Sequence, residues 1–130
     1  MVTETKKREL IELAIRAKER AYAPYSKFKV GSAILGKNGR VFLGCNVENS
    51  SYGLTVCAER VALYNAVSNG CKNFEAIAVV GDGDCYAFPC GACRQVLYEF
   101  EEDMLVLVGK PDGTFLEQRL KDLIPFGFRL

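Results

Sequence analysis

Apolar residues recur at helical spacing near the start of the chain. The repeating positions, which alternate with Lys, Arg and Glu, are Leu10, Leu13, Ala14, Ala17 and Ala21. One face of this segment is therefore apolar and the other is charged, as in a helix that packs on a core. The pattern predicts an amphipathic helix that ends at about Arg20, because Pro24 cannot continue it.

Two segments rich in β-forming residues follow, at residues 28–35 and 40–47. Between them, Lys37, Asn38 and Gly39 tolerate the positive φ angles of a tight turn. The two segments and their connection predict an antiparallel β-hairpin.

The rest of the chain alternates helical patterns with short apolar runs. Helices are predicted from Cys57 to about Asn69 or Gly70, from about Cys90 to Phe100 and over residues 120–124, and strands over residues 74–80, 104–109 and 114–119. A parallel pair needs a crossover of about a dozen residues or more, and only a turn at residues 110–113 joins the last two strands, so these must be antiparallel. The order predicts an α/β fold in three layers, with a mixed five-stranded sheet flanked by helices.

Composition places the chain among ordinary globular proteins. With 130 residues, 49% apolar and 25% charged, and without a linker or internal repeat, residues 1–130 are expected to form a single domain. Lys and Arg total 17 against 16 for Asp and Glu, and a net charge of +1 supplies no strong field for a polyanion. The polar N-terminal segment resembles neither a signal peptide nor a membrane span. We therefore expect a cytoplasmic protein with neither nucleic acid nor membrane as a partner.

Cysteine is the residue type that points to chemistry. The chain has no histidine and six cysteines, which are Cys45, Cys57, Cys71, Cys85, Cys90 and Cys93. In a secreted protein they could form disulfides, but no export signal supports that interpretation. Without histidine, Ser-His-Asp and Cys-His catalysis are excluded, and a zinc site must use sulfur or carboxylate ligands. A Cys-x-x-Cys pair with a third cysteine upstream indicates metal or redox chemistry instead.

Three of these cysteines lie at predicted helix N-termini, Cys57 at one and Cys90 and Cys93 at another. The exposed N–H groups and positive dipole end of a helix favour thiolate over thiol. Two such helix starts can converge on one zinc ion per chain, with the fourth tetrahedral position left for water. Glu59 can take a proton from that water without binding the metal. The alternative, a structural zinc or buried free cysteines, explains neither Glu59 nor the missing fourth ligand.

Charge predicts a role for two arginines near the cysteines. Three thiolates exceed the charge of a divalent ion by about one unit, which makes a bound water harder to deprotonate. Guanidinium groups that donate to the sulfurs would withdraw part of this charge. We expect at least one of Arg60 and Arg94, which each follow a predicted ligand closely, to do so. Cys45, Cys71 and Cys85 are expected to be small core or surface residues.

Four ordered motifs make the chain resemble the small, homotetrameric, zinc-dependent cytidine deaminases over nearly its whole length. The motifs are APYSKF at residues 23–28, GCNVEN at 44–49, CAER at 57–60 and PCGACRQ at 89–95. The last two carry the known Cys-x-Glu and Pro-Cys-x-x-Cys type of signature of nucleobase deaminases. The resemblance implies a cytidine-deaminase-like fold and four chains in the active protein.

The resemblance also implies a set of substrate contacts, made by Phe28, Asn46, Glu48, Tyr52, Ala58 and Phe128. Phe28 would stack on the pyrimidine. Asn46 and Glu48 would bind the ribose 3′-hydroxyl, and their separation by two residues places both on one side of an extended segment. Tyr52 would reach into the site of a neighbouring subunit, and Phe128 would cap the pocket.

By this resemblance the chain hydrolyses cytidine and 2′-deoxycytidine to uridine and 2′-deoxyuridine, with release of ammonia, in pyrimidine salvage. A blasticidin-type antibiotic nucleoside deaminase is the nearest alternative, and Phe28, Asn46 and Glu48 favour cytidine. A polynucleotide or transfer-RNA deaminase is disfavoured by the low net charge and by the short turn at residues 111–113, where those enzymes have a helix. A module that binds nucleosides without turnover would not need Glu59.

Overall fold

The computed structural model describes residues 1–130, and every predicted helix and strand is present. In chain order the elements are α1 (Glu4–Lys18), β1 (Val30–Gly36), β2 (Val41–Cys45), the 3₁₀ helix η1 (Tyr52–Leu54), α2 (Ala58–Ser68), β3 (Phe74–Gly81), α3 (Gly91–Tyr98), β4 (Leu105–Gly109), β5 (Phe115–Arg119) and α4 (Leu120–Leu123). None of the helices combines the length and the apolar composition needed to cross a membrane.

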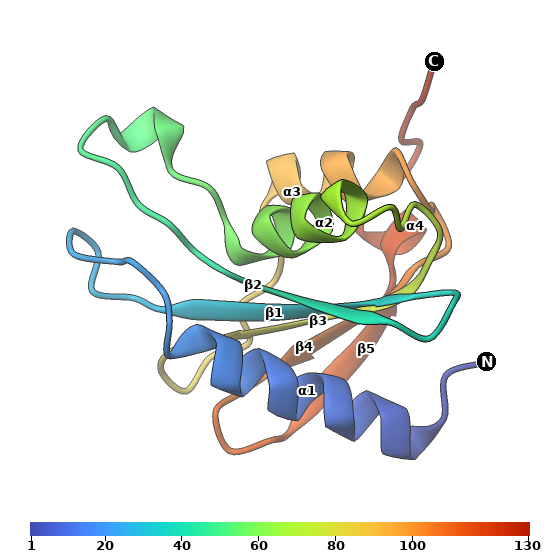
Figure 1. The fold of residues 1–130 in the computed structure, drawn as a ribbon, viewed down its shortest axis with the longest axis horizontal. Helices are drawn as coiled ribbons and strands as arrows, with labels where there is room; N and C mark the ends of the chain where they lie inside the picture. Colours follow the sequence, from blue (N-terminus) through green and yellow to red (C-terminus); the bar gives the residue numbers. More distant parts are fainter.

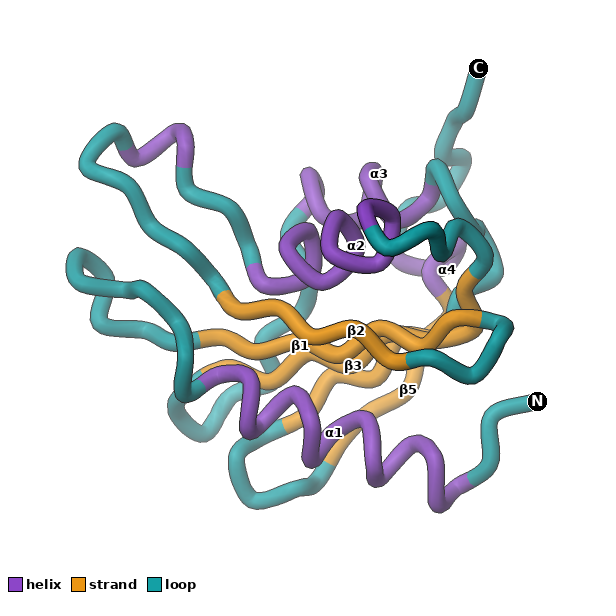
Figure 2. The backbone as a smooth tube through the Cα atoms, in the orientation of Figure 1, coloured by secondary structure: helices purple, strands orange, loops and turns teal.

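The strands form one mixed sheet in the order β2-β1-β3-β4-β5. β3 and β4 run parallel, and every other neighbouring pair is antiparallel. α1 covers one face of the sheet, while α2, α3 and α4 lie over the other (Figure 1). Figure 2 shows the same three layers, with the strands between the helices. The predicted three-layer fold, with its last two strands antiparallel, is therefore confirmed.

β3 is buried on both faces, which explains its unbroken apolar sequence. Ala76 and Ala78 belong to the core cluster under α1, whereas Ile77 and Val79 belong to the cluster under α2 and α3. Alternate residues of a strand point to opposite faces, so each side of the sheet needs its own apolar set. The central strand thus anchors both helical layers.

Two glycines let the helices approach the sheet closely. A Cβ atom at Gly31 would lie 2.0 Å from the Ala14 carbonyl oxygen of α1, and one at Gly44 would lie 2.3 Å from the Ala62 amide nitrogen of α2. Atoms cannot approach so closely, so a side chain at either position would push a helix outwards. Because α2 begins at Ala58, Gly44 helps to determine how deep the N-terminus of this helix lies.

The start of the predicted first strand lies outside the sheet. β1 begins at Val30, and residues 25–29 form an irregular segment with N–H groups that mostly bind side chains. The predicted boundary is wrong because β propensity does not register side-chain partners that are distant in sequence.

Cys57 and Cys90 are the N-cap residues of α2 and α3 rather than their first helical residues.

An ion pair joins the end of α1 to the end of β3. Lys18, which is 8% exposed, places its Nζ 2.6 Å from Oδ1 of Asp82, the residue that follows β3. The hydrogen bond from Lys18 lowers the pKa of the Asp82 carboxyl below its usual range, and the same bond raises the pKa of the Lys18 ammonium. Both shifts mean that folding favours the charged pair.

Stability should therefore depend on pH through this pair. A carboxyl whose pKa is lowered by folding stabilises the protein above its unfolded pKa of about 3.9, and the contribution is lost as the pH falls through the folded value. The Lys18 contribution is complete below about pH 10.4 and is lost as the pH rises through the raised folded pKa. Asp82→Asn should lower the free energy of unfolding by about 1–2 kcal/mol at neutral pH, because it leaves a buried ammonium without its main partner.

Urea unfolding of the wild type and Asp82→Asn at neutral and acidic pH tests this expectation. The difference between the two should shrink as the pH falls from about 3.9, where Asp82 of the unfolded wild type takes up a proton, through the lowered pKa of the folded protein, where the folded carboxyl is protonated too. Glu117→Gln, which removes the more exposed pair with Lys7, is the matched control. A difference that stays constant into acid would contradict the assigned titration.

Candidate active site

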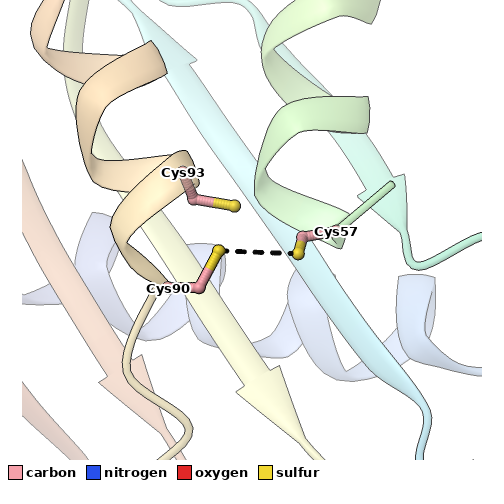
Figure 3. A group of neighbouring side chains, drawn as sticks. All are labelled: Cys57, Cys90 and Cys93. Atoms are coloured by element: carbon pink, nitrogen blue, oxygen red, sulfur yellow. Dashed lines mark hydrogen bonds between the residues drawn. The ribbon is translucent and has the colours of Figure 1, made fainter. Parts of the chain in front are cut away.

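The three predicted ligands come together where two helices begin. Cys57 caps the N-terminus of α2, Cys90 caps that of α3, and Cys93 lies in the first turn of α3. Figure 3 shows the three sulfurs facing one another from the two helix starts. The Sγ atoms of Cys57 and Cys90 are 3.8 Å apart, and all three sulfurs lie within 4.8 Å of one another. The fold thus unites ligands from two separate segments.

This geometry fits a tetrahedral zinc ion. Zinc–sulfur bonds of about 2.3 Å at tetrahedral angles place two sulfurs about 3.8 Å apart. The sulfurs of Cys57 and Cys90 have this separation. No fourth cysteine, aspartate or glutamate joins the cluster, so the three cysteines would hold zinc with one coordination position open to water. An open position is typical of a catalytic zinc centre rather than a structural one.

The protein groups around the sulfurs favour one thiolate. A hydrogen bond from the Cys93 thiol, with a smaller contribution from the Arg60 guanidinium, lowers the pKa of Cys57 to about 5. The Cys57 thiolate and burial in turn raise the pKa of Cys93. Cys57 is therefore the ready anionic ligand, and the binding of a cation would draw the proton from Cys93 as well.

Of the two arginines near the ligands, Arg60 is the one that contacts sulfur. Its Nη2 lies 3.5 Å from Cys57 Sγ, and its buried Nε has no hydrogen-bond partner. The hydrogen bond to Cys57 raises the pKa of the guanidinium still further above its usual range. Arg60 therefore supplies a permanent positive charge beside the thiolates, which offsets part of their excess negative charge.

Arg94 does not contact the sulfurs, so of the two candidate arginines it is not the one that donates to them in this structure. Its Nε donates to the Pro89 carbonyl at 2.7 Å, and its Nη1 donates to the Leu123 carbonyl at 2.8 Å. Successive residues of a helix are rotated by about 100°, so the residue directly after Cys93 points away from the sulfurs. Arg94 instead ties the loop before Cys90 to the end of α4.

Glu59 lies in the first turn of α2 and is 4% exposed. Burial, with a smaller contribution from the Cys57 thiolate, raises the pKa of its carboxyl to about 7. A buried carboxyl with a pKa near neutrality can both accept and donate a proton at physiological pH. The side chain therefore has the properties of a general acid–base group beside the three cysteines.

A cavity of about 250 Å³ opens beside these groups. Its lining residues are Phe28, Val30, Asn46, Thr55, Cys57, Ala58, Glu59, Val79, Ala87, Phe88 and Cys90. Phe28, Asn46, Ala58 and Glu59 therefore share one cavity with two of the cysteines. The volume and the mostly apolar wall suit one small molecule.

Part of this wall was not predicted from the sequence. Phe88 and Ala87 belong to the loop between β3 and α3, and Thr55 follows η1. Phe88 directly precedes the Pro-Cys-x-x-Cys motif, and its position next to two ligands is the one signal that could have identified it. Thr55 and Ala87 have no comparable signal, because small residues in loops carry no periodic pattern.

The Phe28 ring lies against the end of β3. A Cβ atom at Gly81 would come within 2.8 Å of Phe28 Cε1, so the ring packs on a surface that only glycine leaves open. Asn46 donates from Nδ2 to the Phe28 carbonyl at 2.9 Å and accepts from the Val30 N–H at 2.9 Å. Asn46 therefore holds the segment that carries the ring.

Glu48 lies outside the cavity lined by Phe28. Its Oε1 accepts the N–H groups of Tyr25 and Ser26 at 2.9 and 3.1 Å, and its Oε2 accepts the Ser26 hydroxyl. These bonds, above all that from the Ser26 hydroxyl, lower the pKa of Glu48. It borders a neighbouring hollow together with Tyr25, Ser26 and Tyr52.

Tyr52 and Phe128 do not line the cavity of their own chain. Tyr52 is 74% exposed and belongs to η1, in a loop that projects from the body of the molecule (Figure 1). Phe128 is 67% exposed, and its carbonyl accepts a hydrogen bond from Gln95 Nε2 at 3.2 Å. Within one chain the structure therefore leaves both aromatic rings free of the site.

The class of protein follows from the fold and the site together. Three cysteines arranged for a zinc ion with an open position, a buried carboxyl beside them and a cavity for one small molecule define a hydrolytic zinc enzyme on an α/β scaffold. The profile of the family described as "Cytidine and deoxycytidylate deaminase zinc-binding region" matches residues 4–109. The chain belongs to this family of zinc-dependent cytidine deaminases.

Individual relatives agree along almost their whole length. The cytidine deaminase of Halalkalibacterium halodurans is 50% identical over 120 residues, which cover 92% of this chain and 91% of that protein. The cytidine deaminase of Sporosarcina psychrophila is 46% identical over 121 residues, covering 92% and 89%. The crystal structure of cytidine deaminase from Burkholderia pseudomallei superposes with a TM-score of 0.90 at 47% identity and covers 97% of this chain and 99% of its own.

Proposed function

We propose that this protein hydrolyses cytidine and 2′-deoxycytidine to uridine and 2′-deoxyuridine, with release of ammonia. The observation that carries the proposal is the buried Glu59 carboxyl beside Cys57, in a cavity that Phe28 also lines. The relatives named cytidine deaminase support the same reaction. In a cell, the reaction would convert cytidine nucleosides to uridine and 2′-deoxyuridine as a step of pyrimidine salvage.

Glu59 moves the protons in this proposal. Zinc held by the three cysteines would supply the Lewis acidity that makes water a nucleophile near neutral pH. The Glu59 carboxylate accepts a proton from the attacking water and delivers it to N3 of the ring, which makes C4 electrophilic. The same carboxyl passes the second water proton to the departing amino group. One water is consumed, and one ammonia leaves.

The remaining hydrogen-bonding capacity of Asn46 and Glu48 supports their proposed contacts with the sugar. One N–H of the Asn46 amide donates to the Phe28 carbonyl, which leaves the second free to bind a ribose hydroxyl. A carboxylate offers about four acceptor positions, and the segment at Tyr25 and Ser26 uses three of those on Glu48. Phe28 would then stack on the pyrimidine of the same nucleoside.

The alternative functions have less support. A polynucleotide substrate is disfavoured because β5 returns antiparallel to β4 after a short turn, and because the net charge of +1 offers no attraction for phosphates. A module that binds nucleosides without turnover would not require the buried Glu59 carboxyl beside the cysteines. A blasticidin-type substrate stays a second candidate, because it presents a cytosine ring to the same groups.

Ammonia release from the zinc-loaded protein tests the proposal. We expect turnover of cytidine and 2′-deoxycytidine, and none of cytosine, adenosine or single-stranded DNA. Blasticidin S belongs in the same panel, with Glu59→Gln as the control for uncatalysed hydrolysis. Turnover confined to blasticidin S, or binding of cytidine without ammonia release, would overturn the proposed activity.

We also propose that the active protein is a homotetramer in which chains share sites. Tyr52 and Leu54 are 74% and 67% exposed at the tip of the projecting loop, and two large side chains exposed there favour burial by another subunit. Sedimentation should therefore give the mass of four chains.

Mixing two variants with impaired activity tests shared sites directly. Tyr52→Ala and Glu59→Ala should each lower activity, the first by about 10-fold, the loss of one buried aromatic contact. After dissociation and reassembly together, some sites should pair an intact Glu59 with an intact Tyr52 from another chain, so activity should exceed that of either variant alone. Equal activity before and after mixing, or a fully active monomer, would contradict the proposal.

A further inference from the structure

Side chains, rather than a neighbouring strand, hold most of the segment that carries Phe28. The acceptors of its backbone N–H groups are Glu48 for Tyr25 and Ser26, Ser26 Oγ for Phe28, Asp82 for Lys29 and Asn46 for Val30. Glu48 and Asn46 already have proposed roles with the sugar. Asp82 has none, although it binds the residue directly after Phe28.

Asp82 links this segment to two other elements. Its Oδ2 accepts the Lys29 N–H at 2.9 Å, and its own N–H donates to the Lys29 carbonyl at 2.9 Å. Its Oδ1 accepts Lys18 Nζ from the end of α1 at 2.6 Å. Lys18 is only 8% exposed, so its ammonium group depends on nearby carboxylates. Asp82 is closer to it, at 2.6 Å, than Glu19 is, at 3.4 Å. Lys18 thus fixes one oxygen of the Asp82 carboxylate, and the other oxygen fixes the backbone of Lys29.

The Phe28 ring rests on the residue next to Asp82. A Cβ atom at Gly81 would meet Cε1 of the ring at 2.8 Å, so Gly81 forms the surface against which the ring lies. Asp82 therefore controls both the backbone that carries the ring and the strand end that supports it. A shift of this carboxylate would move the aromatic wall of the cavity relative to Glu59.

The segment needs such anchors because its backbone is strained. Lys27, directly before Phe28, has a φ of 61°, in the left-handed region that a lysine rarely adopts. A conformation of this kind persists only where the surroundings hold it. Loss of the anchor at Lys29 should let the segment relax and displace Phe28.

We propose that Asp82, held by Lys18, is a positioning residue that sets the Phe28 wall of the base-binding cavity. This inference rests on the proposed nucleoside substrate. It predicts that Asp82 governs affinity for the pyrimidine and leaves the proton transfers of Glu59 intact. An aromatic contact of ordinary strength corresponds to about a two- to twelve-fold change in affinity.

Steady-state kinetics of Asp82→Ala on zinc-loaded protein test the proposal. KM for cytidine and the inhibition constant of the product uridine should each rise about five-fold, within that range, while kcat changes less than about two-fold and zinc content is unchanged. Lys18→Met should shift KM in the same direction, and Lys18→Arg, which keeps the charge, should restore it. Lys18→Met also serves where Asp82→Ala fails to fold.

Glu117→Ala is the matched control, because Glu117 pairs with Lys7 of the same helix α1 at 2.8 Å and is similarly exposed. It should leave KM unchanged. An unchanged KM in Asp82→Ala, or an equal rise in Glu117→Ala, would overturn the positioning role while the deaminase activity stands. If the wild type does not turn over cytidine, the proposed function fails, and calorimetric binding of uridine to the same variants still decides whether Asp82 positions the wall.

Discussion

Glu59→Ala should lower kcat by at least about 10⁴-fold and leave one zinc ion bound per chain. A single general base contributes roughly 10²–10⁴-fold, and this carboxyl serves the attacking water, N3 and the leaving amine in turn. The carboxylate lies outside the three-cysteine cluster, so metal binding should persist. Ammonia release and zinc content, measured on the same preparation, check both parts.

Glu59→Gln separates the proton transfers from the shape of the site. It keeps the volume of the buried side chain, so a loss as large as that of Glu59→Ala would assign the effect to the missing carboxylate. KM for cytidine should change little in either variant, because Phe28, Asn46 and Glu48 are proposed to hold the nucleoside. Near-normal turnover, or a loss of activity that only follows a loss of zinc, would contradict the mechanism.

Replacing Cys57, Cys90 or Cys93 by alanine should abolish activity together with zinc. The spacing of their sulfurs matches a tetrahedral zinc ion, and the cluster contains no fourth protein ligand. After one cysteine is lost, the two remaining thiolates cannot hold the ion tightly. Metal content by elemental mass spectrometry and cytidine turnover provide the measurements. We expect less than about a tenth of the wild-type zinc after dialysis against a weak chelator.

The other cysteines of the chain offer matched controls for this test. Cys71 is buried, as Cys93 is, and Cys85 is exposed, as Cys90 is, yet neither belongs to the cluster. Cys71→Ala and Cys85→Ala should therefore retain zinc and turnover. Full zinc occupancy in Cys90→Ala would mean that the ligands are wrongly assigned.

Local pattern alone predicted the layers of the fold and the Cys90–Cys93 pair of candidate metal ligands. The apolar run at residues 74–80 predicts a strand buried on both faces, and the turn at residues 110–113 is too short for a parallel crossover, so β5 had to return beside β4. Cys90 and Cys93 lie three residues apart at a helix start, which suffices to predict a metal site. Each of these inferences depends on neighbours within one or two turns of chain.

Only the tertiary structure decided how the walls of the site are built. It directs Arg60 toward Cys57 and Arg94 toward the Pro89 carbonyl, although both arginines closely follow a ligand. It also makes residues 25–29 an irregular segment held by Glu48 and Asp82, where the sequence predicts the start of a strand. Side-chain directions and partners far apart in sequence leave no periodic trace, because they arise from the packing of one element against another.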